Sequence, residues 1–116
     1  MAHHLSEEMR ACIKACLDCY AVCVECKAHC TSLGGKHGDP AHLAAMADCA
    51  MLCELSANFM LRGSELHSSV CGLCADACDR CAKSCERLGA DDEMMRRCAE
   101  QCRKCAQSCR AMANMA

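Results

Sequence analysis

The hydrophobic positions that recur at helical spacing along this chain are occupied by cysteine rather than by leucine, isoleucine or valine. The longest run, over residues 12–30, advances in alternating steps of four and three, and such steps return a side chain to the same face of an α-helix. Residues 71–85 and 98–109 repeat these steps, and Cys49 and Cys53 form a shorter version. No strand-like alternation of apolar and polar residues occurs. The pattern predicts amphipathic helices whose buried stripe consists of thiols.

Residues that start and stop helices divide the chain into four segments, which we expect over residues 7–33, 40–62, 65–88 and 93–113. The expected N-caps are Ser6, Asp39, Ser64 and Asp91 with Asp92, and the expected glycine stops are Gly34, Gly35, Gly63 and Gly89. Residues 36–38 are expected to form a loop. Short loops between four long helices predict an all-α, antiparallel up-down-up-down four-helix bundle with a cysteine-lined core, in a single domain over residues 1–116.

Composition and charge exclude several classes of function. The net charge of −2 and the single Tyr, single Phe and absent Trp argue against nucleic acid as a partner, because such binding needs a basic surface or stacking platforms. We find no segment that approaches the ~20 apolar residues of a membrane span. The N-terminus is polar and acidic and carries no export signal. We therefore expect a cytoplasmic protein, with no membrane partner, whose thiols stay reduced.

Disulfide staples and redox catalysis are two other uses for cysteine, but the spacing fits neither. The total of 17 is odd, and residues three or four apart on a helix hold their Cβ atoms ~5–6 Å apart, whereas a disulfide needs ~3.8 Å. Every C-x-x-C motif lies in the middle of an expected helix, and thioredoxin-like chemistry needs it beside a sheet. We expect metal binding and no enzyme activity. A thiol-stapled helical interaction module is a less favoured alternative.

Charge and spacing together indicate which metal such a core would hold. Thiolates select Cu(I), zinc or iron–sulfur clusters, but structural zinc and iron–sulfur sites need only four thiolates each. Buried thiolates also need matched positive charge. If each Cu(I) ion takes two sulfurs and each sulfur bridges two ions, charge balances at one ion per thiolate. We predict multiple Cu(I) ions per chain, on the order of one per cysteine. The alternative is a zinc or general heavy-metal thiolate buffer of the metallothionein type.

A four-helix bundle filled by C-x-x-x-C and C-x-x-C steps resembles the bacterial copper storage proteins, and the missing export signal makes it similar to their cytosolic branch. The resemblance covers essentially the whole chain. It implies storage or sequestration of Cu(I), a homotetramer of bundles, and a polar mouth with His, Met or Asn ligands, where His42 and Met46 stand. A copper chaperone or a client cuproenzyme could be a further partner. The expected metal ligands are His42, Met46, Cys12, Cys16, Cys19, Cys23, Cys26, Cys30, Cys49, Cys53, Cys71, Cys74, Cys78, Cys81, Cys85, Cys98, Cys102, Cys105 and Cys109.

Antiparallel packing sorts the side chains at the stripe ends into two sets. The end with the glycine loop, which we take as the mouth, is expected to gather Cys30, His37, His42, Met46, Cys85, Met94, Met95 and Cys98. The opposite end is expected to gather Met9, Met60, His67 and Met112. A second apolar stripe lies beside the cysteines and includes Leu17, Val24, Met51 and Leu55. This stripe either forms an oligomer surface or widens the core.

Overall fold

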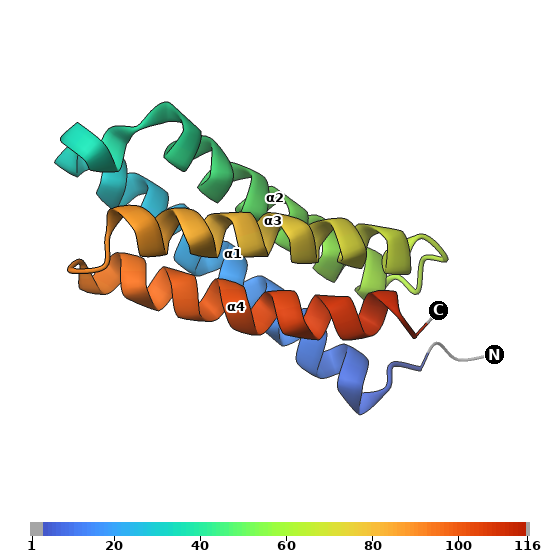
Figure 1. The fold of residues 1–116 in the computed structure, drawn as a ribbon. Helices are drawn as coiled ribbons and strands as arrows, with labels where there is room; N and C mark the ends of the chain where they lie inside the picture. Colours follow the sequence, from blue (N-terminus) through green and yellow to red (C-terminus); the bar gives the residue numbers. More distant parts are fainter. Residues whose placement is uncertain (1–3, 116) are drawn as a thin grey trace.

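The computed structural model describes residues 4–115 and contains no strand in that range. Its helices are α1 (Glu7–Leu33), α2 (Pro40–Leu61), α3 (His67–Leu88) and α4 (Glu93–Ala113), with a short 3₁₀ helix, η1 (Gly35–Gly38), after α1. Figure 1 shows the four long helices running alternately in opposite directions, with both ends of the chain at the same end of the bundle. The predicted all-α antiparallel four-helix bundle is confirmed.

Three of the predicted N-caps act as predicted. Ser6 accepts a hydrogen bond from the backbone N–H of Met9 and begins α1. Asp39 accepts from the N–H of His42, with Pro40 at the first position of α2. Asp92, rather than Asp91, caps α4 by accepting from the N–H of Met95. Each cap satisfies a backbone donor that has no partner inside the helix.

The prediction that Ser64 caps the third helix is wrong. The Ser64 hydroxyl accepts from the N–H of Leu66, two residues along the chain, at 3.1 Å. This contact closes a turn after Gly63, whose φ is 69°, so α3 begins only at His67 and has no side-chain N-cap. Likewise, the segment expected to be a plain loop forms η1, which follows the left-handed Gly34 at φ 68°.

Cysteine, alanine and methionine fill the core of the bundle. All of the cysteines are at most 1% exposed. Small side chains flank them at the contacts between neighbouring helices; buried examples are Ala50, Ala57, Ala75, Ala82, Ala99 and Ala106. The helices pack as a ring, α1 against α2 and α4, and α3 against α2 and α4. The result is a rod of 53 × 19 × 18 Å whose axis is lined by sulfur.

The outer face of α2 is more apolar than a bundle surface needs to be. Met51 is 64% exposed and Leu55 is 44% exposed, and Leu17 and Val24 of α1 are exposed as well. By length and composition alone α2 could cross a membrane, with a mean hydropathy of 1.3, so the expectation that no segment approaches a membrane span is corrected. The helix nevertheless packs into the bundle and buries His42 there. Because Met51 and Leu55 are exposed on its outer face, this part of the second apolar stripe does not belong to the core.

Candidate metal centre

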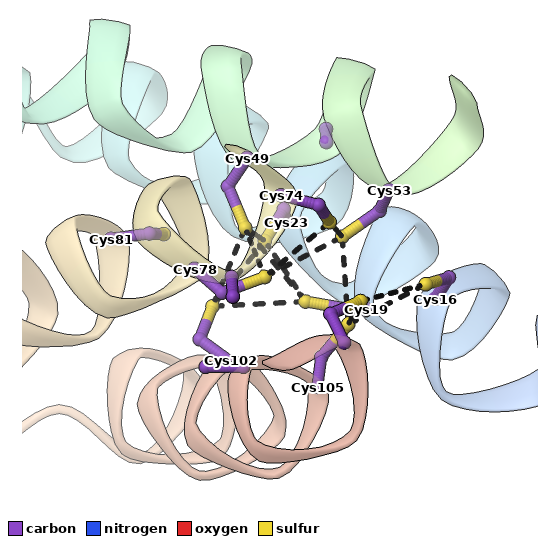
Figure 2. Packing of buried hydrophobic residues seen from close by; sticks show 14 of the residues in the cluster. Cys16, Cys19, Cys23, Cys49, Cys53, Cys74, Cys78, Cys81, Cys102 and Cys105 are labelled. Carbon is purple, nitrogen blue, oxygen red and sulfur yellow. Dashed lines mark hydrogen bonds between the residues drawn. The ribbon is translucent and has the colours of Figure 1, made fainter. Parts of the chain in front are cut away.

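Every helix turns its cysteine stripe toward the axis of the bundle. In Figure 2 the labelled sulfurs of four helices converge on a common centre, and dashed lines join them across the axis. All the cysteines are free and buried. The 3.6-residue repeat of the α-helix accounts for this convergence, because steps of three and four keep the thiols on one face. A disulfide-stapled scaffold is therefore not what the structure contains.

The thiols form a continuous network along the axis. Sulfur–sulfur separations between helices are short, for example 3.4 Å from Cys16 to Cys109 and 3.5 Å from Cys49 to Cys78. Five groups bring their Sγ atoms within 4.8 Å of one another. Numbered from the end that carries the chain termini, group 1 is Cys16, Cys74, Cys105 and Cys109; group 2 is Cys19, Cys53, Cys78 and Cys105; group 3 is Cys19, Cys23, Cys49 and Cys102; group 4 is Cys23, Cys81, Cys98 and Cys102; group 5 is Cys26, Cys85 and Cys98.

Each of the five groups shares at least one cysteine with the next group along the axis. Cys105 belongs to groups 1 and 2, and Cys19 belongs to groups 2 and 3. Groups 3 and 4 share Cys23 and Cys102, and groups 4 and 5 share Cys98. A metal ion held by one group is therefore always one shared sulfur away from the next group. The array can hold ions that bridge sulfurs, or pass an ion along by exchange of one ligand at a time.

The packed thiols change one another's acidity. A hydrogen bond with Cys19 and burial raise the pKa of Cys102. A hydrogen bond from Cys109 lowers the pKa of Cys105 to about 7, and burial raises the pKa of Cys30. One thiolate is stabilised by neighbours that keep their protons, so neighbouring thiols cannot all ionise together without a cation. Metal binding must therefore release protons from the core.

A buried histidine lies at the mouth, which is the end of the bundle formed by residues 34–38 and 89–92. His42 is fully buried, and its Nε2 lies 3.5 Å from the Sγ of Cys30. Its Nδ1 lies 2.6 Å from the hydroxyl of Ser84 on α3. Burial lowers the pKa of His42 and favours the neutral ring. If Nδ1–H donates to Ser84, the lone pair of Nε2 faces Cys30, and His42 and Cys30 can bind one ion together.

Ser84 was not among the predicted site residues. Its sequence signal is weak, because serine at position 84 only continues the helical spacing from Cys81 and stands beside Cys85. Its side chain is nevertheless buried against His42. Met46, one turn along α2 from His42, is also fully buried and belongs to the core cluster that contains the cysteines.

A second pair of potential ligands lies further out at the mouth. The Nδ1 of His37 in η1 is 3.1 Å from the thioether sulfur of Met95. Met95 is fully buried and packs directly against Gly89, where a Cβ atom would collide with its sulfur. Nearby, His29 hydrogen-bonds to Asp92 at 2.9 Å, and this contact lowers the pKa of Asp92. The structure thus brings together the histidines and methionine that the sequence placed at this end.

The opposite end of the bundle, which we call the closed end, is plugged by apolar side chains. Met60 is fully buried, and Leu5 and Met112 are nearly so. Met9 packs against them as a partly buried residue. His67 is half-buried there, as predicted from its place on the stripe, and its Nδ1 has no hydrogen-bond partner within the described residues.

The fold and the sulfur-lined axis together define a class of protein: a helical bundle built to hold metal ions inside. The family model described as "Copper storage protein" matches residues 5–114 of this chain. The chain therefore belongs to the copper storage protein family.

Solved structures agree with this assignment. The Nmul_A1745 protein from Nitrosospira multiformis is 46% identical, with a TM-score of 0.89 over 95% of this chain and 98% of that one. The Cu(I)-bound copper storage protein BsCsp3 is 33% identical, with a TM-score of 0.85 over 92% and 99% of the two chains. Apo-Csp3 from Bacillus subtilis is 34% identical, with a TM-score of 0.73 over 90% and 97%.

A comparison by sequence finds an uncharacterised relative as well. The cysteine-rich protein YhjQ of Bacillus subtilis (strain 168) is 32% identical over 72 residues, which are 62% of this chain and 67% of that protein. Because YhjQ is described only as cysteine-rich, this match supports the cysteine-rich pattern and says nothing of a cargo.

Proposed function

We propose that this protein stores or sequesters many Cu(I) ions on the thiolates inside its bundle. The observation that carries the proposal is the overlapping array of free, buried thiols along the axis. Family membership and the Cu(I)-bound state of the related BsCsp3 support copper as the cargo. We also infer a storage role without enzyme activity, which membership of a storage family supports.

The charge of the core favours Cu(I) over a divalent ion. Among the described residues, the only buried polar or charged side chains are His42, Ser56 and Ser84, and none is a permanent cation. The positive charge that balances the thiolates must therefore come from the cargo. Bridging Cu(I) supplies one charge per thiolate, and a full load is on the order of one ion per cysteine.

Overlap between the groups limits the alternative, a zinc or heavy-metal buffer of the metallothionein type. A four-coordinate ion that does not share ligands can occupy only groups with no residue in common. Groups 1, 3 and 5 satisfy this condition, so at most three such ions fit, and one of them has only three thiolates. Bridging Cu(I) has no such limit, and this difference in capacity favours copper as the principal cargo.

The proposed ligands are all the cysteines, with His42 and Met46 at the mouth. We infer that an ion arrives beside His37 and Met95, is taken by His42 and Cys30, and moves inward from group 5 to group 1. The short contact between Cys30 and His42 supports the first inward step. The shared sulfurs at Cys98, Cys23, Cys102, Cys19 and Cys105 support the rest of the path.

The outer face of α2 supports the further proposal of a homo-oligomer, a tetramer by family resemblance. A groove of about 670 Å³ between α2 and α3 is lined by apolar residues that include Met51, Leu55 and Leu73. Exposed apolar surface of this kind marks protein contacts. We expect Leu55→Glu to shift the molar mass measured by light scattering toward the monomer. Leu66→Glu, at a position that is 62% exposed at the closed end, is the control and should leave the mass unchanged.

We also propose that the protein works in the cytoplasm, where reduced thiols persist, and exchanges copper with a chaperone or a client enzyme. The storage proposal is tested by anaerobic titration of the reduced protein with Cu(I) against a competing chelator. Binding of many ions per chain, well beyond the number of separate four-thiol groups, is expected. Saturation at one or two ions would rule out storage.

A further inference from the structure

One thiol group is far more regular than the others. The sulfurs of group 3 come from Cys19 and Cys23 on α1, Cys49 on α2 and Cys102 on α4. All six Sγ···Sγ separations within the group lie between 3.6 and 3.9 Å. Four points with six nearly equal separations are the corners of a regular tetrahedron. Figure 2 shows these four residues converging from three helices.

The size of this tetrahedron matches one particular coordination chemistry. A zinc ion binds thiolates at ~2.3 Å in tetrahedral geometry, which places the sulfurs about 3.8 Å from one another. Group 3 has this spacing before any metal is bound. We propose that Cys19, Cys23, Cys49 and Cys102 form a pre-organised site for one tetrahedral divalent ion, of which Zn(II) is the type, in the copper-free protein. The proposal rests on the separations between the four sulfur atoms and does not depend on whether the protein stores copper.

The remaining groups lack this regularity. In group 2, Cys53 lies 3.7 Å from Cys78 and 3.8 Å from Cys105, and Cys19 completes the group within 4.8 Å of each member. In groups 1 and 4, Cys74 and Cys81 likewise lie within 4.8 Å of their fellow members, a wider limit than the 3.6–3.9 Å of group 3, and group 5 has only three thiols. The first divalent ion should therefore occupy group 3, and not distribute over the axis.

The surroundings of group 3 set the strength of this binding. A tetrathiolate zinc centre carries a net charge of −2, and no cationic side chain is buried in the core. Partial compensation comes from thiols outside the group: Cys78 lies 3.5 Å from Cys49, and Cys98 lies 3.8 Å from Cys23. Cys98 can keep its proton and donate an S–H···S bond to Cys23, whereas the contact between Cys49 and Cys78 has the geometry for donation from Cys49. The remaining charge is uncompensated, so Cu(I), which neutralises every thiolate, displaces the divalent ion as the core fills.

The experiment titrates reduced, metal-free protein with Co(II) under anaerobic conditions, and then with Zn(II). We expect the visible absorption spectrum of a tetrahedral Co(II)–thiolate site to be complete near the first equivalent of Co(II). One equivalent of Zn(II), which binds more tightly than Co(II), should then bleach this spectrum. X-ray absorption of the wild-type form with one zinc should give four sulfur neighbours at ~2.3 Å. A zinc ion with fewer than four sulfur neighbours, or with oxygen or nitrogen neighbours, would overturn the proposal. This test uses the wild-type protein alone.

A matched pair of variants on α2 locates the site. Cys49 belongs only to group 3, and Cys53, one turn further along and equally buried, belongs only to group 2. Cys49→Ser should weaken Zn(II) binding by about 100-fold or more, since loss of even an outer partner of a ligand costs 10–100-fold. Cys53→Ser should leave the first equivalent unchanged. Equal effects in the two variants would overturn the assignment. Because the Cu(I) titration is a separate measurement, failure here leaves the storage proposal intact.

Discussion

The two ends of the bundle are made of different side chains, although the thiols between them are continuous. At the mouth, a buried His42 faces Cys30, and His37 on a glycine-rich turn contacts Met95. At the closed end, the sulfur column stops against Met60 and Met112 with Leu5. The mouth brings two pairs of potential copper ligands into contact, whereas at the closed end the methionines pack in the core and the Nδ1 of His67 has no hydrogen-bond partner within the described residues. We infer from this difference that the bundle loads from the mouth.

The largest effect expected from this comparison is on stability at the closed end. Met60→Ala removes a fully buried side chain and leaves a cavity, so we expect the free energy of unfolding of the reduced, copper-free protein to fall by about 2–5 kcal/mol. Chemical denaturation measures it. The rate of copper uptake should not change. Leu66→Ala, which replaces a side chain that is 62% exposed at the same end, is the control and should change the unfolding free energy by less than about 0.5 kcal/mol.

The next effect concerns uptake at the mouth. His42→Gln should slow the first phase of Cu(I) transfer from a chelator complex by about 10-fold or more, because it removes a ligand and the contact with Cys30. Rapid-mixing absorbance measures this rate. His67→Gln, at the closed end, should leave the rate unchanged. Equal slowing by both variants would mean that copper does not enter at one end.

Gly89 provides a third way to test the mouth. A methyl group at this position would collide with the sulfur of Met95, so Gly89→Ala should destabilise the fold by about 1–3 kcal/mol. Adding Met95→Ala to the Gly89→Ala variant should remove the collisions with the sulfur and the terminal methyl group of Met95, although the Cβ at position 95 would still lie 2.8 Å from the new Cβ. The double variant should therefore be less destabilised than the sum of the two single changes. If the destabilisations of the two single variants, measured by denaturation, simply add in the double variant, the side chains at positions 89 and 95 do not clash.

The smallest effect is a pH dependence. Burial lowers the pKa of His42 in the folded protein, so below about pH 6.5 the unfolded chain takes up a proton that folded His42 resists. His42 therefore contributes to a loss of stability as the pH falls through that value, and contributes none above it. The wild type should lose more unfolding free energy than His42→Gln over this range. An identical slope in the two proteins would show that the pKa of His42 is the same in the folded and the unfolded chain.

The sequence predicted the bundle and the buried thiols because both follow from local spacing. Steps of three and four between cysteines, together with Ser6, Asp39 and Asp92 as caps, settle which residues form helices and which face is buried. These features depend on one helix at a time. For this reason four helices and their inward stripes could be predicted without knowledge of how the helices meet.

Contacts between helices could not be predicted in the same way. Three features depend on how neighbouring helices are rotated and offset along the axis. They are the hydrogen bond between His42 and Ser84, the packing of Met95 against Gly89 and the regular tetrahedron of group 3. No pattern along a single helix encodes those quantities. The start of α3 was mispredicted for a related reason, because Ser64 bonds to the turn and not to the helix.

The central claim is that bridging Cu(I), and not a separate four-coordinate ion, fills the thiol axis. Anaerobic Cu(I) titration of the reduced protein, with bound copper and free thiols counted on the same sample, tests it most directly. The account predicts uptake on the order of one Cu(I) per cysteine, with the thiols becoming unreactive in step. Saturation at three ions or fewer, with the thiols outside the occupied groups still reactive, would contradict it.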